Sequence, residues 1–177
     1  MKQLKRVQII RRLLLAGIAI SLLSGCQNYQ MTLNDAVVYS PPKIFTDFTT
    51  LDPNLRDCLD QAIADQRVTQ ASDLRRLSCS HAGIGSLVGL EIFLGLEELQ
   101  LSHNKLTQLQ PLALLGQLRI LLVDNNHLKQ IPEVLTLGAL ERLDSQNNPS
   151  LDCRDLKQLA TTFTGELTLP KQCLDAG

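Results

Sequence analysis

The sequence contains no tryptophan, and all of its aromatic residues together make up only 3% of the chain. Proteins that bind single-stranded nucleic acid stack the bases on aromatic side chains, so this composition argues against a stacking surface for bases or sugars. A long hydrophobic run is also missing near the N-terminus. The apolar stretch there, Leu13–Leu23, is too short to span a bilayer as a helix.

The segment 1–25 has the composition of a targeting segment that is removed from the mature protein. Five basic residues precede the apolar stretch, which ends in Leu-Ser-Gly-Cys at residues 23–26. This ending resembles a bacterial lipobox, in which cleavage leaves a new N-terminal cysteine that is acylated. The resemblance implies lipidation at Cys26 and an effectively permanent membrane anchor. The alternative is an ordinary secretory signal beside a chance cysteine.

The residue after the cysteine is Gln27 rather than aspartate. By the resemblance to enterobacterial lipoproteins, this implies sorting to the outer membrane, on its periplasmic side or at the cell surface. Removing residues 1–25 leaves 17 − 5 = 12 basic and 18 acidic residues, a net charge of −6. This balance argues against nucleic acid as a partner and against electrostatic docking on anionic lipid.

One pattern of leucines occurs four times in the sequence, and the four copies are evenly spaced along the chain. The most complete copy is LEELQLSHNKL, residues 96–106, and the other copies begin at Leu74, Leu118 and Leu140. This is the frame of a leucine-rich repeat, in which each unit adds one short strand to a curved parallel sheet. Three copies carry an asparagine that can bond the backbone at the corner after the strand: Asn104, Asn126 and Asn148. The first copy has Ala82 at this position.

Between these frames, apolar residues recur at every third position, as in Leu106, Leu109, Leu112 and Leu115. This step indicates a 3₁₀-like or extended return rather than a full α-helix. The predicted fold class is therefore an α/β leucine-rich repeat solenoid, a short curved parallel sheet of about four coils with a helix capping each end. A generic leucine-rich helical protein is the alternative.

The caps are needed because a solenoid exposes a row of leucines at each end. Asp52-Pro53 predicts the start of the first cap helix, with an N-cap acid followed by proline. Asp152 and Asp155 predict the start of the second cap helix, and Gly165 predicts its end. The alternation at 166–169 indicates a short strand after it. The apolar stripe of that helix is Cys153, Leu156, Leu159, Ala160 and Phe163. The predicted segments are a signal peptide (1–25), a tether (26–51) with a short strand at 36–39, an N-terminal cap (52–73), the repeats (74–151) and a C-terminal cap (152–177).

Four cysteines remain when Cys26 is set aside, and export leaves them in an oxidising compartment where an even number favours disulfides. Three connectivities are possible. Local pairing favours Cys58–Cys79 at the first cap and Cys153–Cys173 at the second. The alternative is four buried free thiols. A zinc site is not expected, because no cysteine pair has the short spacing of zinc ligands.

The run DPNLRDCLDQAI, followed by VTQASDLRRL and SLVGLEIFLGLEELQLSHNKL, resembles the cap-plus-repeat region of internalin-like bacterial proteins. The resemblance covers about residues 52–151. It implies 22-residue repeats behind a helical cap, and a function in binding other proteins. The lipobox and the cysteines of the caps are not part of the internalin pattern, so a role in host-cell invasion is not implied, and the fold alone fixes no ligand.

The titratable residues do not form a catalytic pattern. His81 and His103 hold the same frame position on adjacent coils, about one strand spacing (roughly 5 Å) apart. With Asp124 nearby, they are the candidate for a metal site, and solvated turn histidines are the alternative. No serine or cysteine nucleophile motif accompanies them. We therefore expect neither an enzyme nor a cofactor.

The predicted binding surface lies on the concave face of the sheet. In the third copy of the frame Leu121 and Val123 point inward, so Ile120 and Leu122 point outward, where they gain nothing from folding. An apolar centre with a charged rim is typical of protein interfaces. The predicted rim lies on the two adjacent strands: Glu98, Gln100, Arg142 and Asp144.

These residues predict a protein-binding module whose partner is an unidentified protein. Two alternatives apply to the surface itself: the cap or the tether covers it, or the two aliphatic residues have no role. The alternative for the whole protein is a passive structural lipoprotein of the envelope without a dedicated ligand.

Overall fold

The computed structural model describes residues 31–34, 36–40 and 42–174. The chain divides into two units, one that ends at Pro42 and one that begins at Lys43. The predicted signal peptide, Cys26 and Gln27 lie outside the described residues. In the part of the chain that is described, no helix has both the length and the apolar character needed to cross a membrane.

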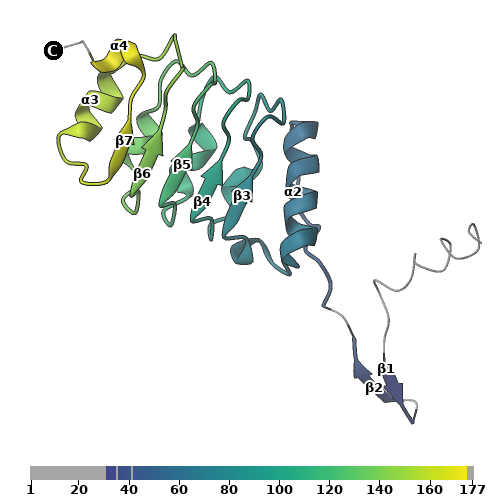
Figure 1. Ribbon diagram of the computed structural model, residues 1–177. Coiled ribbons are helices and arrows are strands. Elements are labelled where there is room, and N and C mark those ends of the chain that lie inside the picture. The colour runs from purple at the N-terminus through teal and green to yellow at the C-terminus, as the bar shows by residue number, and fades with distance from the viewer. Residues whose placement is uncertain (1–30, 35, 41, 175–177) are drawn as a thin grey trace, which may run out of the picture. The chain divides into compact units, whose positions relative to one another are not determined.

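The first unit contains an antiparallel hairpin of β1 (Met31–Leu33) and β2 (Ala36–Tyr39) (Figure 1). Asn34 begins the turn between the strands with a φ of 50°, in the left-handed region that asparagine tolerates and that tight hairpin turns require. Thr32 pairs with Val37, and the register shifts beside Met31. The sequence predicted a strand at 36–39 but not its partner β1.

The second unit is a solenoid with one parallel sheet (Figure 1). Its strands follow the chain order and pair in register, with leucine opposite leucine at the central position of every strand. The structure confirms the predicted α/β leucine-rich repeat solenoid and adds a fifth strand from the C-terminal cap. The strands are β3 (Arg76–Ser78), β4 (Glu98–Gln100), β5 (Ile120–Leu122), β6 (Arg142–Asp144) and β7 (Glu166–Thr168).

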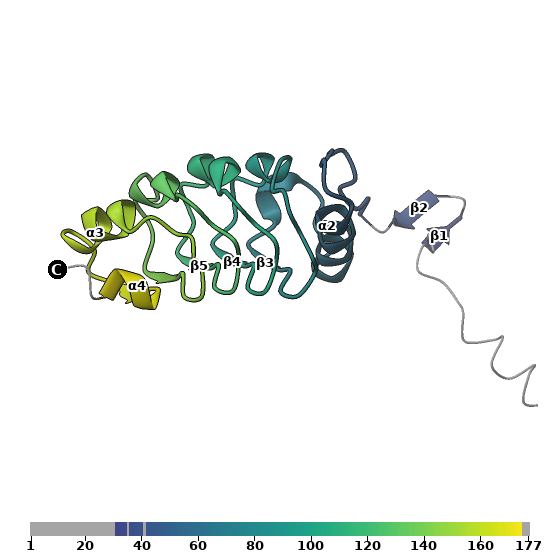
Figure 2. The same cartoon turned by 90° about the horizontal axis from the view of Figure 1, so that it is seen from above.

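The returns between the strands are short 3₁₀ turns, as the three-residue step predicted. They lie along the side of the solenoid opposite the strands (Figure 2), at Leu90–Ile92, Gln110–Leu114 and Pro132–Leu135. A further 3₁₀ turn, Ala71–Asp73, precedes the first coil. The leucines that point into the coil are inaccessible to solvent, and Leu96, Leu99 and Leu101 are each 0% exposed. Their burial between neighbouring coils is the main source of stability for the unit.

Three buried asparagines join consecutive coils at the corner after the strand. The Nδ2 of Asn126 donates to the carbonyl oxygens of Leu101, Val123 and Asp124, and its Oδ1 accepts from the Leu106 amide. Asn104 and Asn148 make the same four kinds of hydrogen bond in their coils. Each asparagine bonds the coil before it. The first coil has no coil before it, which accounts for its lack of this asparagine.

Helix α2 (Pro53–Gln66) caps the first coil, and Asp52 fastens it there. The Oδ1 of Asp52 accepts from the amides of Asn54 and Leu55 at the helix start, and its Oδ2 accepts from those of Gly85 and Ser86 in the first coil. Partial burial by itself would raise the pKa of Asp52, but the four N–H donors outweigh it and hold the pKa below its ordinary value. The residue that begins the helix therefore also binds the cap to the repeats.

The tether predicted for residues 26–51 ends earlier than expected, because two phenylalanines before α2 pack against the solenoid. The Phe45 amide donates to the Val68 carbonyl oxygen at 2.8 Å, and Phe48 is only 6% exposed. Both rings contact the Phe93 ring, with centroids 6.1 and 5.5 Å away. The Arg56 guanidinium lies 4.1 Å from the centre of the Phe48 ring. The N-terminal cap thus includes residues from Lys43 onward.

The C-terminal cap consists of α3 (Arg154–Ala160), β7 and α4 (Lys171–Leu174). Leu156 and Leu159 are buried as predicted, but Ala160, predicted on the same apolar stripe, is exposed. The prediction that Gly165 ends the helix is wrong, since the C-cap is Thr161. Gly165 is instead a point of close approach, where a Cβ atom would lie 2.0 Å from the Glu141 carbonyl oxygen.

Both predicted disulfides are present. Cys58 of α2 is bonded to Cys79, directly after β3, with their Cα atoms 5.9 Å apart. Cys153, directly before α3, is bonded to Cys173 of α4, with Cα atoms 5.3 Å apart. Each bond closes a loop of about 20 residues, for which the chain-entropy model gives a stabilisation of roughly 3 kcal/mol.

Candidate functional site

The outward residues of the five parallel strands form two columns on either side of the buried central leucines. The parallel register sets Glu98, Ile120 and Arg142 side by side in the first column. The same register sets Gln100, Leu122 and Asp144 side by side in the second. The six residues of the predicted surface are therefore neighbours on one face, in the arrangement that the frame predicted. Their role in binding stays a prediction.

The aliphatic centre of this surface is less accessible than the sequence pattern predicted. Ile120 and Leu122 are both half-buried, as are Glu98, Gln100 and Asp144, whereas Arg142 is exposed. The reason is the strand spacing of about 4.8 Å, which lets neighbouring side chains cover part of each other's surface. Ile120 and Leu122 thus retain a partly solvated apolar surface between polar neighbours.

Ion pairs run across the strands at one edge of this face. Arg75 pairs with Glu97 at 2.9 Å and Arg119 pairs with Glu141 at 2.8 Å, each joining adjacent coils. The hydrogen bond between Arg119 and Glu141 raises the pKa of the guanidinium and lowers that of the carboxyl group. Such exposed pairs add little stability, but they fix the side chains in place and keep this edge polar.

Arg142, predicted to orient a partner, lies 3.5 Å from Glu166 on β7. The repeat frame did not predict Glu166 as part of the surface, because continuing the frame from Arg142 leads to position 164 rather than 166. In the register of the sheet Glu166 nevertheless continues the first column beside Arg142. The charged rim on this side therefore includes a carboxylate as well as a guanidinium.

The two histidines of the candidate metal site stack on each other. The rings of His81 and His103 are 4.1 Å apart between centroids and 12° from parallel. Both residues have left-handed backbones, with φ of 59° and 58°, at a turn position that Asn125 and Asn147 hold in the next coils. Histidine and asparagine are among the residues that tolerate this conformation best, which accounts for their place at the turn.

Asp124, the third group of that candidate metal site, is already engaged. One of its carboxylate oxygens accepts from Ser102 and the other from Asn125. Among the described residues, no three histidine, cysteine, aspartate or glutamate side chains gather closely enough to hold a metal ion. The histidine pair therefore lacks a third protein ligand in this part of the chain.

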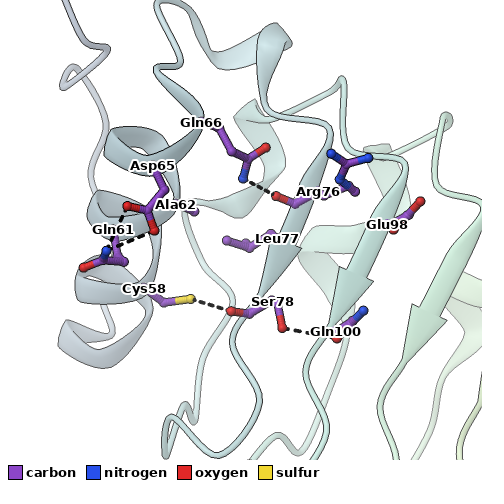
Figure 3. A pocket seen from close by; sticks show the side chains of 10 residues that line it. All are labelled: Cys58, Gln61, Ala62, Asp65, Gln66, Arg76, Leu77, Ser78, Glu98 and Gln100. Atoms are coloured by element: carbon purple, nitrogen blue, oxygen red, sulfur yellow. Dashed lines mark hydrogen bonds between the residues drawn. The ribbon is translucent and has the colours of Figure 1, made fainter.

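A hollow of about 390 Å³ lies beside the predicted surface, where α2 meets the first two strands of the sheet (Figure 3). Ten residues line it, five from α2 and five from the strands: Cys58, Gln61, Ala62, Asp65 and Gln66, with Arg76, Leu77, Ser78, Glu98 and Gln100. Glu98 and Gln100 belong to the predicted surface as well. The hollow therefore extends that surface toward the cap helix.

Hydrogen bonds hold the polar side chains of the hollow in place (Figure 3). Gln66 donates to the Arg76 carbonyl oxygen at 2.7 Å, and Ser78 donates to the Gln100 side chain at 3.2 Å. Gln61 donates to both carboxylate oxygens of Asp65. The hollow was not predicted from the sequence, because it forms between a helix and a sheet and no periodicity of either one marks the junction.

Solved structures of two bacterial internalins share this fold. Internalin C2 of Listeria monocytogenes superimposes with a TM-score of 0.59 at 22% identity, over 72% of this chain and 62% of the internalin chain. Internalin F of the same species superimposes with a TM-score of 0.57 at 23% identity, over 68% of this chain and 36% of the internalin chain. The chain thus spans less than two thirds of the length of either internalin. These likenesses confirm the internalin-like repeat fold that the sequence resemblance implied.

No protein-family model and no curated protein matches the chain.

Proposed function

We propose that this protein is a lipid-anchored interaction module of the bacterial envelope, and that the concave face of its sheet binds another protein. The observation that carries the proposal is the aliphatic pair Ile120 and Leu122 on the middle strand of five, facing outward among polar neighbours. Solenoids commonly bind partners on the concave surface that their strands line. The internalin-like fold supports this use of the face.

The polar surroundings give this face the means to select a partner. Glu98 and Gln100 on one side, with Arg142 and Asp144 on the other, offer both charge signs and an amide around the aliphatic pair. The hollow beside α2, with a volume of about 390 Å³, offers room for a side chain of the partner. Recognition rather than catalysis is the proposed activity, in line with the internalin-like repeat fold.

Replacing Ile120 and Leu122 together with serine is expected to abolish capture of the partner by crosslinking in intact cells. Because both side chains are half-buried, the double variant should also lose about 1–2 kcal/mol of unfolding free energy, which leaves it folded. Leu114→Ser with Leu135→Ser is the matched control, since these leucines lie exposed on the 3₁₀ returns. Retention of the partner by the first variant, or equal loss in both, contradicts the proposal.

The anchor requires its own test. Cys26→Ala is expected to abolish incorporation of radiolabelled palmitate and to leave an uncleaved or soluble product, since the acylated sulfur and the cleavage site are both lost. The wild-type chain, labelled in parallel, is the positive control. Label in the Cys26→Ala protein at the wild-type level would show that the lipobox interpretation is wrong.

A further inference from the structure

The hairpin β1–β2 exposes large apolar side chains on both of its strands. Met31 is 52% exposed, Leu33 65%, Val37 56% and Val38 59%. Isolated two-stranded hairpins are at best marginally stable in water, and these side chains gain nothing from folding while they remain hydrated. The hairpin is therefore expected to meet an apolar surface that lies outside its own two strands.

The composition around the hairpin suits a lipid surface. Between Cys26 and Pro42 the sequence has one charged residue, Asp35, and no lysine or arginine, so contact with lipid would desolvate little charge. Both tyrosines of the chain, Tyr29 and Tyr39, also fall in this segment. Tyrosine is enriched where acyl chains meet headgroups, because its ring is apolar and its hydroxyl is polar.

The position of the hairpin along the chain favours the same surface. Met31 is five residues after Cys26, and five residues of extended chain reach no farther than about 18 Å. An acylated Cys26 would thus keep the exposed aliphatic residues within that distance of the bilayer, at a high effective concentration. This step depends on the lipid anchor of the proposed function.

We propose that the β1–β2 hairpin lies in the headgroup region of the anchoring bilayer and forms a second, non-covalent membrane contact. The contact is apolar rather than electrostatic, in agreement with the absence of basic residues from the segment. The competing occupant is the hairpin of a second copy, paired strand to strand through the unprotected edges.

The chain carries its own reporter for this contact, because it has no tryptophan and two tyrosines. We would reconstitute the full, acylated Tyr29→Phe chain, in which Tyr39 alone emits, into phosphatidylethanolamine–phosphatidylglycerol vesicles. A share of the lipid would carry bromine on the upper acyl chain, where it quenches fluorescence on contact. The expected result is at least a roughly twofold loss of Tyr39 emission, since interfacial tyrosines reach that depth.

Adding Val37→Asn and Val38→Asn is expected to restore the emission while the acyl chains keep the protein on the vesicles. Leu114→Asn is the matched control, since Leu114 is 65% exposed, slightly more than Val37 and Val38, but lies on a 3₁₀ return of the solenoid. It should leave the quenching unchanged. Unquenched Tyr39 in a vesicle-bound chain overturns this inference alone, and dimers crosslinked through the hairpin would then identify a second copy as the occupant. A chain missing from the vesicle fraction overturns the anchor, and this inference with it.

Discussion

Replacing Gly95 with alanine is expected to destabilise the solenoid by about 3 kcal/mol or more, because the new methyl group has no space. A Cβ atom at Gly95 would lie 2.0 Å from the carbonyl oxygen of Ser72. That oxygen belongs to backbone, which cannot rotate away as a flexible side chain does. Ser72 lies in the 3₁₀ turn that leads into the first coil, and nearby the Glu97 amide donates to the Arg75 carbonyl oxygen at 2.8 Å. Relief of the overlap would therefore separate the first two coils.

Urea denaturation followed by circular dichroism measures this loss. Gly116→Ala is the matched control, because no atom lies within 4 Å of a Cβ built at Gly116 and its φ is not in the left-handed region. The unfolding free energy of that variant should lie within about 0.5 kcal/mol of the wild-type value. Equal midpoints for the two variants would mean that Ser72 and Gly95 are not in contact in solution.

Replacing Asn126 with alanine is expected to lower the unfolding free energy by about 3 kcal/mol, the second largest effect among the substitutions considered. Asn126 is 2% exposed and makes four hydrogen bonds with the backbone of its own coil and of the coil before. Alanine leaves the buried Leu106 amide without a partner, which costs about 1–3 kcal/mol. It also removes one N–H donor from each of the carbonyl oxygens of Leu101, Val123 and Asp124, which keep their other hydrogen bonds. The loss should appear as a lower thermal midpoint, with the strand content of the folded state unchanged.

Asn147→Gly is the control for that experiment. Asn147 is also an asparagine at the corner of a coil, but it is exposed and its side chain donates a single hydrogen bond, to Asn125 at 3.2 Å. Glycine adopts the φ of 52° found there without strain, so the thermal midpoint should change little. Similar losses in both variants would contradict the role assigned to the buried asparagines.

The repeats were predictable from the sequence because the constant step between copies of the frame fixes the strand register. Once Leu99 and Leu121 are aligned, the pleat leaves no choice about which residues face outward, and Glu98 must lie beside Ile120. The N-terminal cap helix and both disulfides were predictable for a related reason. Asp52-Pro53 marks the helix start, and the cysteines fall in two pairs, 21 and 20 residues apart, one at each cap.

Other features depend on contacts that leave no periodic signal. Alternation indicated a strand at 166–169, but β7 begins two positions later than the repeat frame would place it, so the sequence did not predict that it joins the sheet. Phe45 and Phe48 join the cap through an aromatic cluster with Phe93, which no spacing in the sequence marks. The hollow beside α2 and the half-burial of Ile120 arise only when the elements pack. These differences concern how accessible the proposed binding face is and how far it extends.

The central claim is that the concave sheet face binds a protein, and site-specific photocrosslinking in intact cells tests it most directly. A photoreactive amino acid at Gln100 would stand beside Leu122 without removing the aliphatic pair. The same group at Leu114, 65% exposed on a 3₁₀ return, provides the comparison. The account predicts one discrete adduct from position 100 and none from position 114. Adducts from position 114 alone, or none from position 100, would contradict it.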